Sequence, residues 1–187
     1  MNNSRATKFL KTYSKVFSLT AAILTFCSLS FAGEVGGKRF PDGPDLHKTP
    51  GALCENSNTY RYPAQIRYCE RNVDSRLKNR IIAEYDREFG FDVQKMPRGD
   101  FKIDHFIPLS IGGSNHESNL WPQHKSVYAH SDKIESLLAN LISADLITQD
   151  AAIDAVKTCK LNLERCADIE AHLEALSLVL SLAPKSF

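Results

Sequence analysis

Between Ile103 and Gln123 the chain reads Ile-Asp-His-Phe-Ile-Pro-Leu-Ser-Ile-Gly-Gly-Ser-Asn-His-Glu-Ser-Asn-Leu-Trp-Pro-Gln, and these residues carry the pattern from which the central fold is predicted. Residues 101–109 alternate well enough between apolar and polar side chains for a strand, with Pro108 at its end or edge. Gly112-Gly113 then turns the chain. Residues 120–123 offer a short return strand. The pattern therefore predicts two strands joined by a loop.

Helical patterns flank this pair of strands. Apolar residues recur at helical spacing over 74–89, with Gly90 as the end, and again from about residue 131. Further helices are expected from Thr148, as N-cap, to about residue 158, and over 168–182. We expect Asp132, Lys133 and Glu135 to form a solvated helix start. The chain is thus predicted to be α+β, with a strand–loop–strand–helix core and additional helices at both ends.

The amino-terminal segment resembles a secretory signal peptide. Four basic residues precede an apolar run of 17 residues, Val16–Ala32, which ends in Ser-Phe-Ala. We expect cleavage after Ala32, so that residues 1–32 are removed and the protein is periplasmic or secreted, with no membrane contact when mature. A membrane anchor is the alternative, but a spanning helix needs roughly 20 apolar residues. Cys27 does not indicate a lipoprotein, because a bulky Phe precedes it.

Removal of the leader changes the charge and leaves one domain's length of chain. The mature part has 187 − 32 = 155 residues, with 23 − 4 = 19 basic against 22 acidic side chains, a formal charge of −3. This balance counts against tight, sequence-independent binding to duplex nucleic acid. Residues 33–51 are rich in Gly and Pro and are expected as an extended lead-in to a single domain over 52–187.

A basic cluster stands out against this acidic balance. Six basic side chains gather in one segment, and they are Arg61, Arg67, Arg71, Arg76, Lys78 and Arg80. The cluster suits a solvated helix face and a phosphate-binding face equally well.

Four cysteines remain after cleavage, and an even number in an exported protein indicates two disulfides. The favoured pairs are Cys54–Cys69 and Cys159–Cys166, because each closes a short loop. A zinc site with four cysteine ligands is the rival, but the chain has no Cys-x-x-Cys spacing.

Asp104 and His105 together carry the chemistry that hydrolysis of a phosphodiester needs. A neutral imidazole can take a proton from water at physiological pH, and a divalent ion held by a carboxylate can stabilise the developing charge. In an ideal strand, adjacent side chains point to opposite faces. A distorted strand end would have to bring the two groups to one site.

The whole string resembles the HNH endonuclease motif, above all in its Asp-His, Gly-Gly and Asn-Leu-Trp-Pro elements. The resemblance is closest to small exported bacterial HNH proteins, covers roughly 49–159 and is strongest over 101–135. It implies a β-β-α-metal core, which the two expected disulfides would staple. Asp104 would then be a metal ligand, His105 the general base, and Asn119 the residue that fixes the loop presenting the histidine.

The second metal ligand departs from the family pattern. Many HNH proteins have a histidine or asparagine nine residues beyond the middle asparagine, where this chain has Tyr128. Phenol is a poor ligand for a hard divalent ion. We expect His130 to take that place, with His124 as the reserve. The ion expected is Mg²⁺ or Mn²⁺, and imidazole ligation also admits Zn²⁺.

Two functions are compatible with these features. The first is an exported, metal-dependent endonuclease that hydrolyses phosphodiester bonds in DNA or in RNA. The second is a non-catalytic exported module that binds nucleic acid or protein on the same scaffold. The charge of −3 and Tyr128 at the ligand position motivate the second. If the protein acts as a toxin on another cell, an immunity or inhibitor protein would be a further partner.

Overall fold

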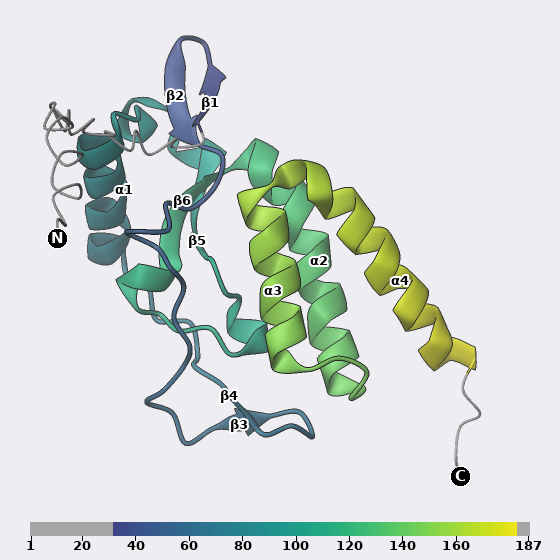
Figure 1. Cartoon of the computed structure of the whole chain (residues 1–187). Coiled ribbons are helices and arrows are strands. Elements are labelled where there is room, and N and C mark those ends of the chain that lie inside the picture. Colours follow the sequence, from purple (N-terminus) through teal and green to yellow (C-terminus); the bar gives the residue numbers. More distant parts are fainter. Residues whose placement is uncertain (1–31, 183–187) are drawn as a thin grey trace, which may run out of the picture.

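The computed structural model describes residues 32–182, so the predicted signal peptide up to Phe31 lies outside the described part. At its centre, β5 (Phe101–His105) and β6 (Leu120–His124) form an antiparallel pair in which Phe101 faces His124 and His105 faces Leu120. Helix α2 (Lys125–Ser143) follows β6 directly. The predicted order of strand, loop, strand and helix is confirmed (Figure 1).

The boundaries of this central unit differ from the sequence prediction at two points. Strand β5 ends at His105, because the chain turns into a 3-10 helix at Leu109–Ile111 after Pro108. Helix α2 begins at Lys125, six residues before the expected start near 131. Its N-cap is His124, whose Nδ1 accepts a hydrogen bond from the Ser126 N–H at 3.3 Å. Imidazole is an uncommon cap, so none of the usual cap residues marks this helix start in the sequence.

Helix α1 (Ser75–Phe89) covers one side of the β5–β6 pair and buries Ile81, Ile82 and Tyr85 there. Its ends follow from local chemistry. The Asp74 carboxylate accepts from the Leu77 N–H, and Gly90 ends the helix in the left-handed conformation at φ 68°. Both ends agree with the prediction.

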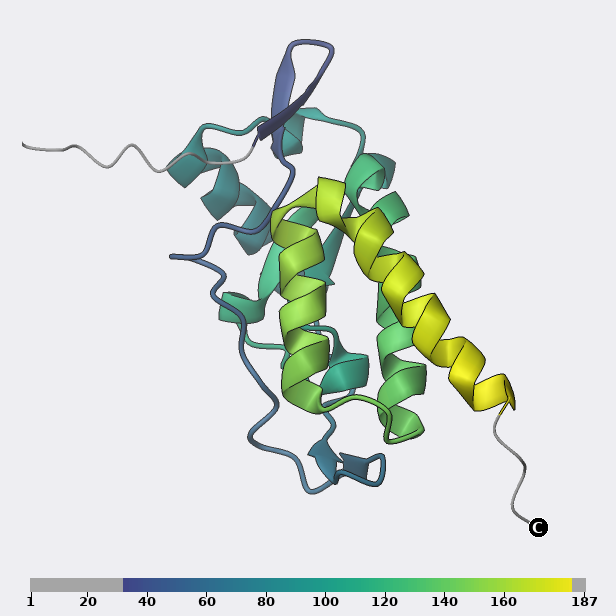
Figure 2. The same ribbon diagram turned by 45° about the vertical axis from the view of Figure 1, so that its right-hand side comes forward.

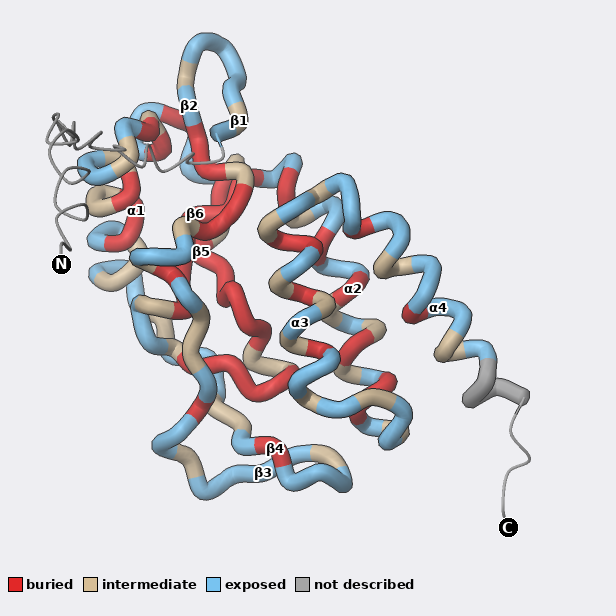
Figure 3. The backbone as a smooth tube through the Cα atoms, in the orientation of Figure 1, coloured by how far each residue is buried: buried red, intermediate tan, exposed pale blue. Residues whose placement is uncertain are grey.

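Helices α3 (Gln149–Leu161) and α4 (Cys166–Leu182) pack with α2 on the other side of the strands. Figure 2 shows the three helices side by side. They enclose an apolar cluster that is separate from the one under α1 and includes Ile134, Leu138 and Val156. Figure 3 shows buried positions along the inner sides of α2 and α3. The fold is mixed α+β, with small antiparallel sheets and four α-helices in the described part of the chain.

Two small hairpins precede α1. Strands β1 (Ala32–Val35) and β2 (Lys38–Pro41) pair within the segment expected as an extended lead-in, and Phe40 stacks on His124 with 4.0 Å between ring centroids. Strands β3 (Tyr60–Arg61) and β4 (Ile66–Arg67) form the second hairpin. Short 3-10 helices lie at Val93–Lys95, Arg98–Asp100, Leu109–Ile111, Glu117–Asn119 and Leu163–Arg165.

Both disulfides form as favoured, Cys54–Cys69 and Cys159–Cys166. The four cysteines of the described residues are therefore paired in disulfides, and none is free as a thiolate ligand for the alternative zinc site. Within residues 32–182, no helix combines the length and the apolar character needed to cross a membrane.

Candidate functional site

The side chains of Asp104 and His105 leave β5 on opposite faces, as regular strand alternation requires. Asp104 faces Trp121 across the pair and contacts Lys160 of α3. His105 contacts Arg71 and Asn115, which lie in two loops. The β5–β6 register runs without interruption to His105, and the two side chains contact different groups.

His105 is 3% exposed and is held at both ring nitrogens. Its Nδ1 lies 3.3 Å from Arg71 Nη1, and its Nε2 lies 3.1 Å from Asn115 Oδ1. A guanidinium only donates and a carbonyl oxygen only accepts, so these partners select the neutral tautomer with the proton on Nε2. The Nδ1 lone pair then faces Arg71.

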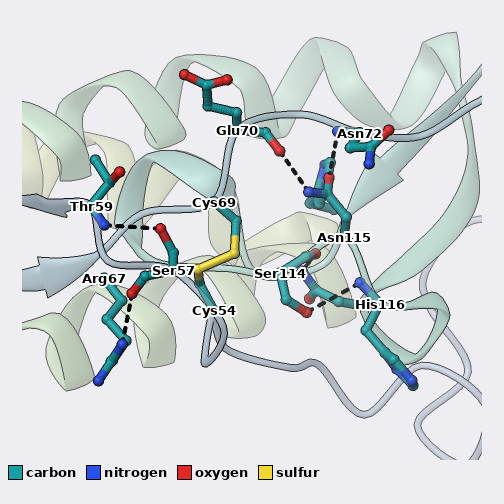
Figure 4. Close-up of a disulfide and its surroundings, with 12 residues drawn as sticks. Cys54, Ser57, Thr59, Arg67, Cys69, Glu70, Asn72, Ser114, Asn115 and His116 are labelled. Atoms are coloured by element: carbon teal, nitrogen blue, oxygen red, sulfur yellow. Dashed lines mark hydrogen bonds between the residues drawn. A yellow bond between two sulfur atoms is a disulfide. The ribbon is translucent and has the colours of Figure 1, made fainter.

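The Asn115 amide is itself held by two further hydrogen bonds, which keep its oxygen directed at His105 Nε2. Its Nδ2 donates to Glu70 O at 2.7 Å, and its Oδ1 accepts from the Asn72 N–H at 3.1 Å (Figure 4). Because Glu70 and Asn72 follow Cys69, the Cys54–Cys69 disulfide anchors the segment that makes both contacts. The same segment includes Arg71 and so places its guanidinium in contact with His105.

The environment of His105 keeps its imidazole neutral. Burial lowers the pKa of His105 to about 4, and the charge of Arg71 adds to this effect against an opposing hydrogen bond with Asn115. At physiological pH the imidazole therefore carries no proton on Nδ1. This is the protonation state that a general base requires.

Asn119 ties together the loop between β5 and β6. It is fully buried, and its Oδ1 accepts from the Ile107 N–H at 2.8 Å. Its Nδ2 donates to Ile107 O and to Ser114 O, both at 2.9 Å. Gly113 packs against these hydrogen bonds and leaves no room for a side chain, since a Cβ there would come within 1.8 Å of Ile107 O. Asn119 thus holds the loop as the resemblance implies, while any role in catalysis stays a prediction.

Replacement of Asn119 by alanine is expected to destabilise the fold. The variant removes three hydrogen bonds to buried backbone groups, each worth about 1 kcal/mol or more, so we expect a loss of about 3 kcal/mol in the free energy of unfolding. Urea unfolding of Asn119→Ala beside Asn140→Ala, an exposed asparagine of α2, measures the difference. Equal stability of the two variants would show that the loop does not depend on Asn119.

Asp104 is engaged by a buried lysine that no pattern in the sequence singles out. The ammonium of Lys160 is fully buried, 2.9 Å from Asp104 Oδ2, 2.7 Å from His105 O and 2.6 Å from Glu135 Oε1. Burial would raise the pKa of Asp104, but the charges of Lys160 and Lys102 lower it. Burial alone would lower the pKa of the Lys160 ammonium, but the carboxylates of Asp104 and Glu135 raise it above its ordinary value.

The prediction of a solvated helix start is wrong for Glu135. Asp132 and Lys133 are exposed as predicted, whereas the Glu135 side chain is only 23% exposed and turns toward Lys160. Burial raises the pKa of Glu135. The partner lies 25 residues further along the chain, in a helix whose sequence indicates only a structural role.

The two predicted histidine ligands do not join Asp104. His130 is exposed on α2. His124 is buried, stacks on Phe40 and, by strand alternation from Trp121, points away from the face that carries Asp104. Across residues 32–182, no three His, Cys, Asp or Glu side chains are grouped so that they could hold a metal ion.

The oxygens around Lys160 allow a direct test of whether a divalent ion fits. The carboxylates of Asp104 and Glu135 and the carbonyl of His105 are donors that Mg²⁺ prefers. The ammonium of Lys160 lies among all three of them. The arrangement at Asp104 therefore does not fit a divalent ion beside Lys160. The contact between His105 and Arg71 is the other candidate for chemistry at this end of β5.

Comparisons of the chain with protein-family models, with curated proteins and with solved structures find no match. The function is therefore inferred from the site. Its parts are a neutral imidazole, an exposed arginine in contact with it and an amide that fixes the ring. Arg71 belongs to the basic cluster that stands out in the sequence, whereas Asn115 carries no signal beyond its place next to the glycine turn.

Proposed function

We propose that this protein is an exported nuclease that hydrolyses phosphodiester bonds in DNA or RNA, with the imidazole of His105 as general base. One arrangement supports this above all: a neutral histidine lies at the end of β5 in contact with an exposed guanidinium. The order β5, β6, α2 agrees with the core that the HNH resemblance implies. Two disulfides suit an oxidising compartment outside the cytoplasm.

The site suggests how the reaction would run. Arg71 would bind two oxygens of the phosphate, since a guanidinium matches that geometry, and would turn away from His105 in doing so. The freed Nδ1 would take a proton from water as the water oxygen bonds to phosphorus. The bond to the leaving oxygen breaks, and that oxygen takes a proton from solvent. Asn115 would hold Nε2–H and stabilise the imidazolium.

The buried ion pair of Asp104 and Lys160 favours a second candidate, the non-catalytic binding module. In that case Asp104 serves the fold, and Arg71 contacts an anion without turnover. Binding of nucleic acid with no cleavage under any condition would be the signature of this second function.

Plasmid nicking by the mature protein, residues 33–187 with both disulfides formed, separates the two candidates. We expect supercoiled plasmid, whose underwound duplex opens locally into unpaired strands, to be converted to the open circle. Parallel reactions with Mg²⁺, Mn²⁺, Zn²⁺ or EDTA test the divalent ion predicted from the sequence. A folded sample that binds the plasmid but never nicks it would refute the nuclease and support the module.

The pH dependence of cleavage should report the low pKa of His105. In kcat/KM the acid limb reflects the free enzyme, so activity should stay high from neutral pH downward and fall only as the pH approaches about 4. An ordinary exposed histidine would give a fall near a pKa of about 6.5. Rates on one oligonucleotide, followed from neutral pH to below the pKa of His105, measure this. An inflection at the ordinary histidine value would contradict the proposed state of His105.

A further inference from the structure

The β3–β4 hairpin and Tyr68, which directly follows β4, present two arginine–tyrosine pairs. The guanidinium carbon of Arg61 lies 3.2 Å from the centre of the Tyr68 ring, and that of Arg67 lies 5.1 Å from the centre of the Tyr60 ring. Tyr60 is 44% exposed, and both arginines are exposed. Flat cationic and aromatic groups of this kind are the surfaces on which unpaired bases stack.

The hairpin is held firmly enough to act as a platform. Ile66 is buried, and the Tyr62 hydroxyl donates to Ser110 O at 2.7 Å. The turn places two non-glycine residues, Tyr62 and Gln65, in the left-handed region at φ 65° and 54°. Such residues persist where the surrounding structure fixes them. The Cys54–Cys69 disulfide then closes the base of the hairpin.

The chain leads from the hairpin to the proposed site within a few residues. Arg67 and Arg71 are four residues apart, which is at most about 14 Å of extended chain, and Arg71 contacts His105. A phosphate backbone lying along this segment would meet the two guanidinium groups in turn. Segment 55–80 has six basic and three acidic residues, a local charge of +3 in a mature chain of −3.

A hollow lies against the same hairpin. It has a volume of about 540 Å³, and its lining includes Tyr60, Gln65, Arg67, Gly112 and Gln149. This size falls within the range of sites for small organic molecules. The hollow is open on one side, and its volume would accommodate a base that has left its stack.

We propose that Tyr60, Arg61, Arg67, Tyr68 and Arg71, the Arg–Tyr surface, bind single-stranded nucleic acid and lead it to His105. The inference rests on the proposed function and names its substrate form. Bases in a duplex are stacked on each other, so only an unpaired strand can offer its faces to Tyr60 and Arg67. The acidic balance of the rest of the chain disfavours a duplex, whose binding depends on many phosphate contacts.

Fluorescence anisotropy with labelled oligonucleotides tests this surface. The parent is the His105→Ala variant of residues 33–187, so that cleavage does not interfere, and His105→Gln replaces it if the alanine variant does not fold. We expect the parent to bind a single strand at least about tenfold more tightly than the duplex of the same sequence. Tyr60→Ala with Arg67→Gln should weaken single-strand binding about tenfold or more. The slope of log Kd against log salt concentration should also fall by about 0.7, because Arg67→Gln removes one phosphate-binding cation.

Arg165→Gln is the matched control, because this arginine is exposed in the 3-10 helix Leu163–Arg165, outside the hairpin. It should bind like the parent. Unchanged single-strand binding in the Tyr60/Arg67 variant, or a preference for the duplex, would overturn the Arg–Tyr surface. If the wild type cleaves but the variant binds normally, this inference alone fails. If binding depends on the surface but the wild type never cleaves, the proposed nuclease fails and the surface stands.

Discussion

Replacement of His105 by alanine is expected to lower the rate of phosphodiester cleavage between about 100-fold and 10,000-fold, the range by which general bases contribute. The reason is specific to this imidazole. Its Nδ1 faces Arg71, its Nε2 is held by Asn115, and its pKa is lowered to about 4, so it is neutral when the phosphate arrives.

The control for this variant is His172→Ala, which removes an exposed histidine of α4. It should cleave like the wild type. Because His105 is buried, the His105→Ala sample must also show a native circular dichroism spectrum and cooperative unfolding. A folded His105→Ala protein that cleaves at the wild-type rate would exclude His105 as the base.

Replacement of Lys160 by methionine is expected to destabilise the protein by about 3–5 kcal/mol. The variant leaves the carboxylate of Asp104 buried without its main partner, and breaking a buried pair in this way costs that amount. Urea unfolding at neutral pH measures the difference. The matched control is Lys133→Met, whose ion pairs with Glu170 and Glu174 involve an exposed lysine, so this variant should lose far less stability than Lys160→Met.

Two further measurements identify the cause of this destabilisation. In the wild type the pKa of Asp104 is lowered, so its contribution to stability is present above its ordinary pKa of 3.8 and is lost as the pH falls through the folded value. In Lys160→Met, burial should raise that pKa, and the deficit should shrink as the pH approaches about 4. Adding Asp104→Asn should also recover part of the stability. A Lys160→Met variant within about 1 kcal/mol of the wild type would show that this pair is not a buried ion pair of the usual strength.

Local signals in the sequence were sufficient for the framework of the fold. Asp74 and Gly90 mark the ends of α1, Thr148 caps α3, and alternation with a glycine turn identifies the β5–β6 pair. Short loops were enough to favour both disulfides. These features depend on residues that are close in sequence, which is why spacing and cap chemistry predict them.

The contacts of the candidate site could not be predicted in the same way. Asn119 and its loop follow from the motif, but Lys160 reaches Asp104 from 56 residues away and Arg71 reaches His105 from 34 residues away. Neither pairing leaves a spacing pattern, because it depends on how α3 and the Cys54–Cys69 segment pack on the strands. The prediction that Asp104 and His105 share one site also required a distorted strand end, whereas strand alternation separates their side chains.

The most direct measurement is the rate of plasmid nicking by folded wild-type protein and by folded His105→Ala, prepared and assayed in parallel with and without divalent ions. We expect nicking by the wild type and a rate at least about 100-fold lower in the variant. Equal rates in the two proteins, or no nicking by a wild type that binds the plasmid, would contradict the role of His105 as the base of a nuclease.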